Sequence, residues 1–285
     1  MTDMLQPCHL RLRNVRGLVT VLQVLKCSGK HPCVMMVAST GIKVIFEDDA
    51  KAMQGWAFFK PHVFSTFECP GPSRTLGVRI QQLIDVLKVF ACSPDAELRL
   101  RYPGPNAELL LEQTDDAGDA GRMCTYARVS TEEAGAPRSF EEFFDAASES
   151  HFLVPGALLR EAMEDLEWVG SEVAVEMDDR AQRVVLSGSH EAGAGSLAVE
   201  IPREKMVAFR CATGGVRRSY NYKHLQGALC NTPTFREAPE VSTGVSVDRR
   251  GMMKVTHLIG MGAAGGQAIN ASVVFMVAPL LEEED

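Results

Sequence analysis

Two pairs of amphipathic segments recur at one distance along this chain of 285 residues. Apolar residues at helical spacing predict helices at about 15–26 and 79–90, and again at about 155–167 and 219–229. The interval from position 15 to position 155 equals the interval from position 79 to position 219. This repeat predicts two similar halves, each of which must bury the same faces of the same elements.

The predicted helices rest on regularly spaced apolar residues. Leu18 lies on the buried side of the first helix and Leu83 on that of the second, and Pro155 is typical of a helix N-terminus. The fourth helix is shorter, and we expect it to rest on Tyr220, Leu225 and Leu229.

Short β-rich runs separated by turn residues lie between and after these helices. CVMMVAST and GIKVIFED follow the first helix, and EVAVEMDD and QRVVLSGS follow the third. Because strand follows strand without a crossover helix, the pattern indicates an α+β fold with antiparallel sheets and two helices lining one face of each half. We expect a first domain at 1–130, an acidic connector at 131–150, a second domain at 151–280 and an acidic tail at 281–285.

The acidic residues are concentrated in two segments. The formal net charge is −8, while the connector carries six acids against one base and the last four residues are all acidic. The rest of the chain therefore sums to about +1, so it can still carry a local basic face.

The composition excludes several classes of protein. Apolar residues make up 46% and charged residues 23%, as in folded globular proteins. No apolar run is long enough to span a membrane, and the N-terminus lacks a secretion signal, so we expect an intracellular protein without a membrane partner. Eight scattered cysteines without a CxxC pair argue against a zinc site and a disulfide framework, and indicate reduced thiols.

Candidate catalytic motifs are explained more simply as turns. The paired carboxylates at 48–49, 115–116 and 178–179 could hold two metal ions, but each pair lies where strands turn. Gly260, Gly262 and Gly265 match GxGxxG without the helix that a dinucleotide site requires. The sequence therefore predicts no catalytic residue, no metal ligand and no cofactor, and indicates that the protein is not an enzyme.

Basic and amide side chains mark the polar faces of three helices. Arg16 shares a stripe with Thr20 and Gln23, and Lys26 lies beside it. Lys88 and Lys223 lie on the second and fourth helices, whereas acidic residues outnumber Arg160 on the third. Such faces can meet phosphates without reading base edges.

The chain resembles the checkpoint sliding-clamp family, which has the fold of proliferating cell nuclear antigen. The resemblance is greater to the Rad-one subunits of the nine-one-one clamp, and it spans roughly residues 11 to 279. It rests on the collinear order of these motifs: Asn14-Val15-Arg16, Gly41-Ile42-Lys43-Val44, Arg79-Ile80, Leu159-Arg160-Glu161-Ala162, Ala208-Phe209, Tyr222-Lys223 and Arg250-Gly251.

This resemblance implies a function that depends on assembly. The resemblance implies that this chain and two different partner subunits form a ring around duplex DNA in the nucleus. It also implies that an ATP-dependent clamp loader places the ring on the DNA. Clamps of this family recruit checkpoint and repair proteins, and the resemblance implies no ATP site in this chain. Lys88 and Lys223 match basic positions of the inner helices, while Arg16, Lys26 and Arg160 are assigned from helix faces alone.

The resemblance also implies a docking site for partner peptides with an aromatic anchor. Its expected borders are Ile42, Met276, Ala278 and Pro279, with Phe140, Phe143 or Phe144 nearby. The alternative interpretation of the three phenylalanines is that they fasten the connector to the sheet.

Two other functions stay open at this stage. A homotrimeric replicative processivity clamp would have the same fold. A 3′ to 5′ DNA exonuclease would need Asp48 or Asp178 to act with Mg²⁺.

Overall fold

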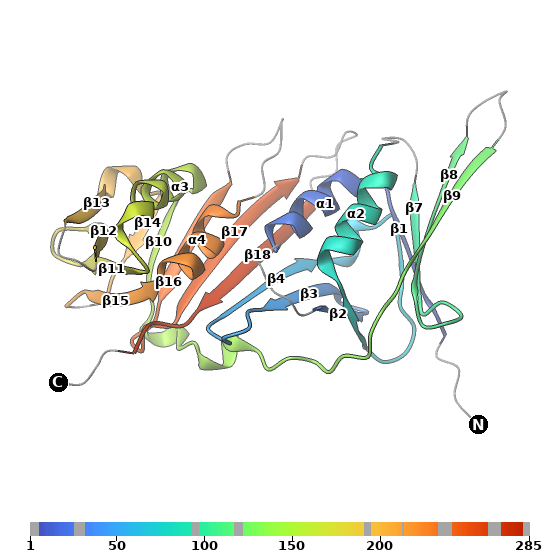
Figure 1. Cartoon of the computed structure of the whole chain (residues 1–285), viewed down its shortest axis with the longest axis horizontal. Helices are drawn as coiled ribbons and strands as arrows, with labels where there is room; N and C mark the ends of the chain where they lie inside the picture. Colours follow the sequence, from blue (N-terminus) through green and yellow to red (C-terminus); the bar gives the residue numbers. More distant parts are fainter. Residues whose placement is uncertain are drawn as a thin grey trace.

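The computed structural model describes residues 6–25, 32–92, 97–116, 122–190, 195–212, 214–232, 241–261 and 269–281. The first half is rich in strands and contains two helices (Figure 1). In chain order its elements are β1 (Cys8–Leu12), α1 (Val15–Val24), β2 (Cys33–Ala38), β3 (Gly41–Glu47), β4 (Met53–Phe59), η1 (Pro61–Val63), β5 (Thr66–Glu68), β6 (Arg74–Val78), α2 (Ile80–Phe90), β7 (Leu98–Tyr102), β8 (Leu109–Asp116) and β9 (Arg122–Val129).

The second half repeats this order after two short 3-10 turns, η3 (Phe140–Phe143) and η4 (Ala146–Ser148). Its elements are β10 (Ser150–Pro155), α3 (Gly156–Asp165), η5 (Glu167–Val169), β11 (Glu172–Asp178), β12 (Arg183–Ser189), β13 (Ser196–Pro202), η6 (Arg203–Lys205), β14 (Ala208–Arg210), β15 (Val216–Asn221), α4 (Tyr222–Cys230), β16 (Ser242–Val247), β17 (Met253–Met261) and β18 (Ile269–Val277). The interval from the start of α1 to the start of α3 differs by a single position from the interval between the starts of α2 and α4, which confirms the repeat in the sequence pattern.

The strand pairing is duplicated as well. Each half forms a five-stranded and a four-stranded antiparallel set, in the orders β5-β1-β7-β8-β9 with β6-β2-β3-β4, and β14-β10-β16-β17-β18 with β15-β11-β12-β13. One further ladder, between β18 and β4, joins the halves into a central nine-stranded sheet. The antiparallel α+β architecture predicted from the sequence is confirmed.

The helices and the segment between β9 and β10 lie on opposite faces of the central sheet (Figure 1). Alternate residues of a strand point to opposite faces. On β4, Ala57 and Phe59 therefore join the main core beneath the helices, whereas Trp56 joins a second cluster that contains Phe140.

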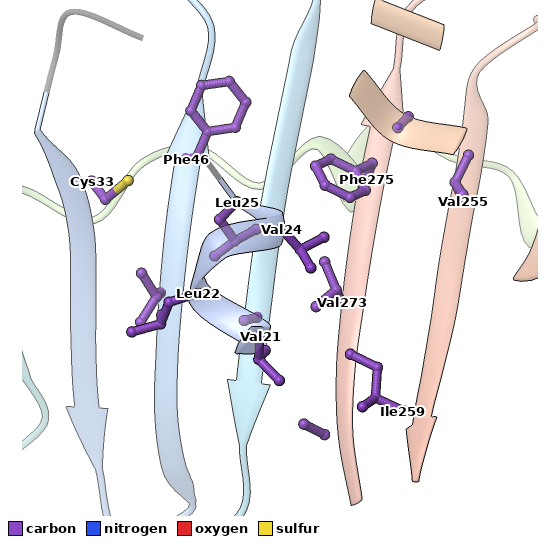
Figure 2. Packing of buried hydrophobic residues seen from close by; sticks show 14 of the residues in the cluster. Val21, Leu22, Val24, Leu25, Cys33, Phe46, Val255, Ile259, Val273 and Phe275 are labelled. Atoms are coloured by element: carbon purple, nitrogen blue, oxygen red, sulfur yellow. The ribbon is translucent and has the colours of Figure 1, made fainter. Parts of the chain in front are cut away.

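Helix α1 packs across the seam between the halves (Figure 2). Val21 and Val24 lie near Val273 and Phe275 of β18, which belongs to the second half of the chain. The two halves therefore share one apolar core.

Two sequence expectations differ from the structure. The segment expected to begin the fourth helix is strand β15, and α4 starts only at Tyr222, with the Asn221 side chain capping its first turn. Tyr220 is a buried strand residue whose hydroxyl donates to the Gly251 carbonyl at 2.7 Å. In addition, a strand precedes the first helix of each half, β1 before α1 and β10 before α3.

Candidate functional site

Helices α1, α2 and α4 each present a basic residue from the predicted set to solvent. Arg16, Lys88 and Lys223 are exposed. The Arg16 Nε donates to the Ala91 carbonyl at the end of α2 at 2.9 Å, and Lys88 Nζ lies 3.8 Å from Asp85 Oδ1. Both ion-pair side chains are about half exposed, so Lys88 stays available to another anion.

Helix α3 has a different character. Arg160 is partly buried and donates to the Thr232 hydroxyl, while Glu161, Glu164 and Asp165 are exposed. Positive charge on the described helix faces is therefore found on α1, α2 and α4. Lys26 lies outside the described residues. Exposed bases of this kind suit weak, salt-sensitive contacts with phosphates.

A separate apolar cluster covers the opposite face of the central sheet. This outer cluster consists of Ile45, Trp56, Phe140, Val274 and Met276. Phe140 comes from η3, whereas the other members come from β3, β4 and β18, so the cluster fastens the connector across the seam. Of the sheet residues in this cluster, only Met276 was predicted. Trp56 is adjacent to Ala57 on β4, so it faces the side of the sheet away from the main core.

Buried and charged side chains hold the connector in place. The Gln54 side chain, 1% exposed, donates to the Arg138 carbonyl at 2.9 Å and accepts from the Phe140 amide at 3.1 Å. Lys254 Nζ lies 3.2 Å from Glu141 Oε1. At the ends of the segment, Glu132 pairs with Gly77 of β6, and the Asp145 amide donates to Asp248 Oδ2 at 3.0 Å.

Lys43 lies beside Trp56, a member of this cluster that is 5% exposed. Lys43 Nζ lies 4.4 Å from the centre of the Trp56 ring. Burial lowers the pKa of the Lys43 ammonium, and the nearby Glu141 carboxylate partly offsets that effect. Lys43 therefore lies over a buried aromatic ring, with Glu141 and Lys254 as its charged neighbours.

The predicted partner-binding residues lie in three environments. Met276 and Phe140 are buried in the outer cluster, and Phe143 is 38% exposed beside Arg138. Phe144, Ala278 and Pro279 are partly buried, and the Ala278 amide donates to the Ala52 carbonyl at 2.8 Å. Ile42 departs from the expectation because it points into the main core, where it is 7% exposed.

One strand of each half, β9 in the first and β13 in the second, lies at the edge of its sheet. Within the described residues, β9 pairs only with β8, and β13 pairs only with β12. Met123 and Tyr126 on β9 are 61% and 68% exposed. Trp168 is 53% exposed, and a Cβ added at Gly195, the residue before β13, would lie 3.4 Å from its ring. Exposed aromatic side chains beside strand edges of this kind mark surfaces that another chain can cover.

A group of arginines that the sequence did not single out lies on the solvent face of the five-stranded sheet. The strand register places Arg11 beside Arg99 and places Arg101 two residues farther along β7. Arg128 lies on the same face on β9, and Glu112 pairs with Arg99 at 3.7 Å. The spacing of Arg99 and Arg101 indicates that these two share one face of a strand, but no local pattern brings Arg11 and Arg128 to the same face.

Two of the candidate carboxylates, Asp48 and Asp178, accept backbone hydrogen bonds in turns. Asp48 Oδ1 accepts from the amides of Ala52 and Met53, and its Oδ2 lies 3.2 Å from His224 Nε2. Asp178 Oδ1 accepts from the Ala181 and Arg180 amides, and these bonds lower its pKa. Across the described parts of the chain, no three His, Cys, Asp or Glu side chains gather in a way that could hold a metal ion.

Some of the predicted positions cannot be placed. Gly262 and Gly265 of the glycine motif and the last four acidic residues lie outside the described residues. In the described part of the chain, no helix has the length and apolar character needed to cross a membrane.

Comparison with protein families gives a match along most of the chain. Residues 9–259 match the family described as "Repair protein Rad1/Rec1/Rad17". The chain belongs to this family. It is 27% identical over 252 residues to the cell cycle checkpoint protein RAD1 of Mus musculus, with 87% of this chain and 85% of that protein covered. Against the Homo sapiens protein of the same name the identity is 26%, with coverage of 87% and 84%.

Similarity to solved structures shows that this chain has the DNA clamp fold. PCNA from Thermococcus kodakaraensis superimposes with a TM-score of 0.74 at 13% identity, covering 96% of this chain and all of that one. A. fulgidus PCNA bound to the C-terminal region of FEN-1 has a TM-score of 0.71 at 12% identity, with 97% and 100% covered. The PCNA2-PCNA3 complex of Sulfolobus tokodaii has a TM-score of 0.70 at 13% identity, with 96% and 100% covered.

Proposed function

We propose that this chain is a non-enzymatic subunit of a heterotrimeric checkpoint clamp that encircles duplex DNA in the nucleus and recruits checkpoint and repair proteins. Family membership and the names of the mouse and human relatives support the checkpoint role. The clamp fold supports ring assembly. In this proposal, 1–130 and 151–280 are the clamp domains, joined by the connector at 131–150.

The observation that carries the ring is the internal β18·β4 ladder. In the duplicated topology, β18 corresponds to β9, and β4 corresponds to β13. The contact that joins the two halves inside the chain can therefore be repeated between chains, with β9 of one subunit pairing with β13 of the next. Such a head-to-tail contact closes into a ring when the rotation per subunit allows it.

Two unlike partners are proposed because different clamp chains can form complexes. The Sulfolobus tokodaii structure is a complex of two different clamp chains, PCNA2 and PCNA3. A replicative homotrimer is the alternative.

Closure of the ring explains how the chain can stay on DNA although its net charge outside the acidic segments is close to zero. A closed ring cannot leave duplex DNA sideways, so weak phosphate contacts from Arg16, Lys88, Arg160 and Lys223 suffice. The ATP-dependent loader belongs to the proposal, because a closed ring must be opened to enclose DNA.

The connector face is the proposed docking site for partner peptides. Lys43 is partly exposed over the buried Trp56, and Phe143 stays partly exposed beside the buried Phe140. The A. fulgidus structure supports this assignment, since it contains a region of FEN-1 bound to a clamp of the same fold.

Size-exclusion chromatography with light scattering tests the assembly. We expect the purified chain to have the mass of one chain at micromolar concentration, and to form a larger complex only with two different clamp subunits. A stable homotrimer of the chain alone would replace the checkpoint proposal with the replicative one.

A charge substitution at the β9 edge tests the proposed contact. Tyr126→Glu should weaken assembly with the partner subunits at least tenfold, because it places a carboxylate in an interface that excludes water. Leu258→Glu is the matched control, since Leu258 is 56% exposed on β17 in the middle of the nine-stranded sheet. Equal assembly of both variants would disprove pairing through β9.

A further inference from the structure

Two cysteines face each other across the outermost strand pair of the five-stranded sheet. In the β1·β5 ladder, His9 lies opposite Glu68, so the next pair in register is Cys8 and Cys69. Their Sγ atoms are 2.6 Å apart. Opposite residues of antiparallel strands have Cα atoms about 4.5–5.5 Å apart, which is within the range of disulfides.

The two thiols differ in their access to solvent. Cys8 is 1% exposed, whereas Cys69 is partly exposed. Cys69 lines an open groove of about 660 Å³, together with Gln6, His9 and Pro70. A small oxidant can therefore reach Cys69 from solvent, while Cys8 lies behind it.

A buried arginine organises the pair. Arg74, 5% exposed, donates to Cys8 Sγ and to the Gln6 carbonyl, and its Nη1 lies 3.8 Å from Cys69 Sγ. The guanidinium therefore contacts the Cys8 sulfur and lies near the Cys69 sulfur, and its hydrogen bonds fix the position of the pair.

We propose that Cys8 and Cys69 are a site of reversible oxidation, at which a peroxide converts the two thiols into a disulfide. Burial and the hydrogen bond with Cys69 raise the pKa of the Cys8 thiol to about 12, so Cys8 stays protonated while Cys69 reacts first.

The reaction has two steps. The Cys69 thiolate attacks one oxygen of hydrogen peroxide, the O–O bond breaks, and hydroxide leaves and takes up a proton to give water and a sulfenic acid. Cys8 then attacks the Cys69 sulfur. The S–S bond forms, the S–O bond breaks, and the Cys8 proton leaves with the hydroxyl as a second water. Two thiols are oxidised and one peroxide is reduced.

The crosslink would act on a weakly held element. Strand β5 has only three residues, lies at the edge of its sheet and pairs only with β1 in the described part of the chain. A disulfide would join it covalently to β1 and restrict the unfolded chain between positions 8 and 69. Oxidation should therefore raise the thermal midpoint by several degrees, and dithiothreitol should reverse the rise.

Mass spectrometry of the full chain tests the proposal. The protein is treated with hydrogen peroxide, denatured, and alkylated at its remaining thiols. Because the chain has eight cysteines, we expect six alkyl groups after oxidation and eight without it, with Cys8 and Cys69 in one crosslinked peptide. Cys69→Ser should keep seven alkylated thiols, whereas Cys92→Ser, at an exposed cysteine, should fall from seven to five.

Two results would overturn the proposal. One is that Cys8 and Cys69 both stay alkylated at peroxide concentrations that convert other cysteines to sulfenic acid, and the other is a crosslink between different cysteines. The peptide map of the unchanged chain decides this point even where a variant fails to fold.

Discussion

His257 shows how one residue ties stability to pH. Its ring is fully buried between α4 and β16, where Nε2 donates to the Ala228 carbonyl at 2.7 Å and Nδ1 accepts from the Thr243 hydroxyl at 2.9 Å. Both contacts suit a neutral imidazole. Burial lowers the pKa of His257 to about 4, and the hydrogen bond to Ala228 only partly offsets it.

We expect the stability contributed by this site to be present above about pH 6.5 and lost as pH falls toward 4. In that window the unfolded chain binds a proton at His257 and the folded chain does not, so the free energy of unfolding decreases by up to about 3 kcal/mol. Urea denaturation at several pH values measures the slope.

Two variants separate His257 from the other titrating groups. His257→Gln should have a shallower pH dependence than the unchanged chain, whereas His62→Gln, at an exposed histidine, should keep it. An identical slope in all three proteins would show that His257 does not control this window.

At the scale of elements, the connector depends on one buried aromatic ring. Phe140 is 8% exposed in the outer cluster, while Phe143, three residues later in the same turn, is 38% exposed. Phe140→Ala should lower the free energy of unfolding by about 3 kcal/mol, because it removes the apolar contact with Trp56 and Met276. Urea denaturation measures this loss.

Limited trypsin digestion reports on the connector directly. Cleavage after Arg138 should accelerate in Phe140→Ala and change little in Phe143→Ala, since the buried Phe140 ring still packs against the sheet in the second variant. Equal cleavage rates would mean that the backbone contacts, not the ring, fasten the connector.

At the scale of the whole molecule, the seam between the halves is sensitive to added volume. Gly55 on β4 faces Phe275 on β18, and a Cβ at Gly55 would lie 2.6 Å from the Phe275 ring. Gly55→Ala should lower the free energy of unfolding by about 1–3 kcal/mol because the ring must move. Gly135→Ala, which has open space around it, is the matched control in thermal or urea denaturation.

The assembled ring offers a second test at this scale. Lys88→Glu with Lys223→Glu should shorten the lifetime of the ring on circular DNA about 3- to 10-fold at low salt, because phosphate contacts are replaced by repulsion. Arg101→Glu with Arg128→Glu reverses the same amount of charge on the solvent face of the five-stranded sheet and should leave the lifetime unchanged. A larger effect of the substitutions at the arginine pair would show that DNA contacts the solvent face of the five-stranded sheet instead.

Local sequence patterns predicted the presence and type of the helices and strands better than the residues at which these elements begin and end. The spacing of Leu83, Ile84 and Leu87 defines the buried side of α2 because neighbouring turns of one helix bury the same face. The same reasoning placed Tyr220 on a helix, although it lies on β15. Its apolar neighbours fit a short strand as well as a helix, and pairing with β11 selects the strand.

Ile42 and Ile45 show what could not be predicted for the partner surface. Both are apolar residues of β3, but they are three positions apart and so face opposite sides of the sheet. Composition cannot tell whether the even-numbered or the odd-numbered residues of β3 face the helices, because both faces of the sheet are covered. The helices bury one and the connector buries the other.

The sequence alone determined the twofold repeat, the antiparallel α+β class and the acidic connector, since spacing and composition are local properties. Only the tertiary structure decided that β18 pairs with β4, that Phe140 closes the outer cluster and that β9 and β13 are among the edge strands of the described sheets. These features depend on the register between segments that lie far apart in the sequence, as Gly55 and Phe275 do, and no local pattern encodes such a register.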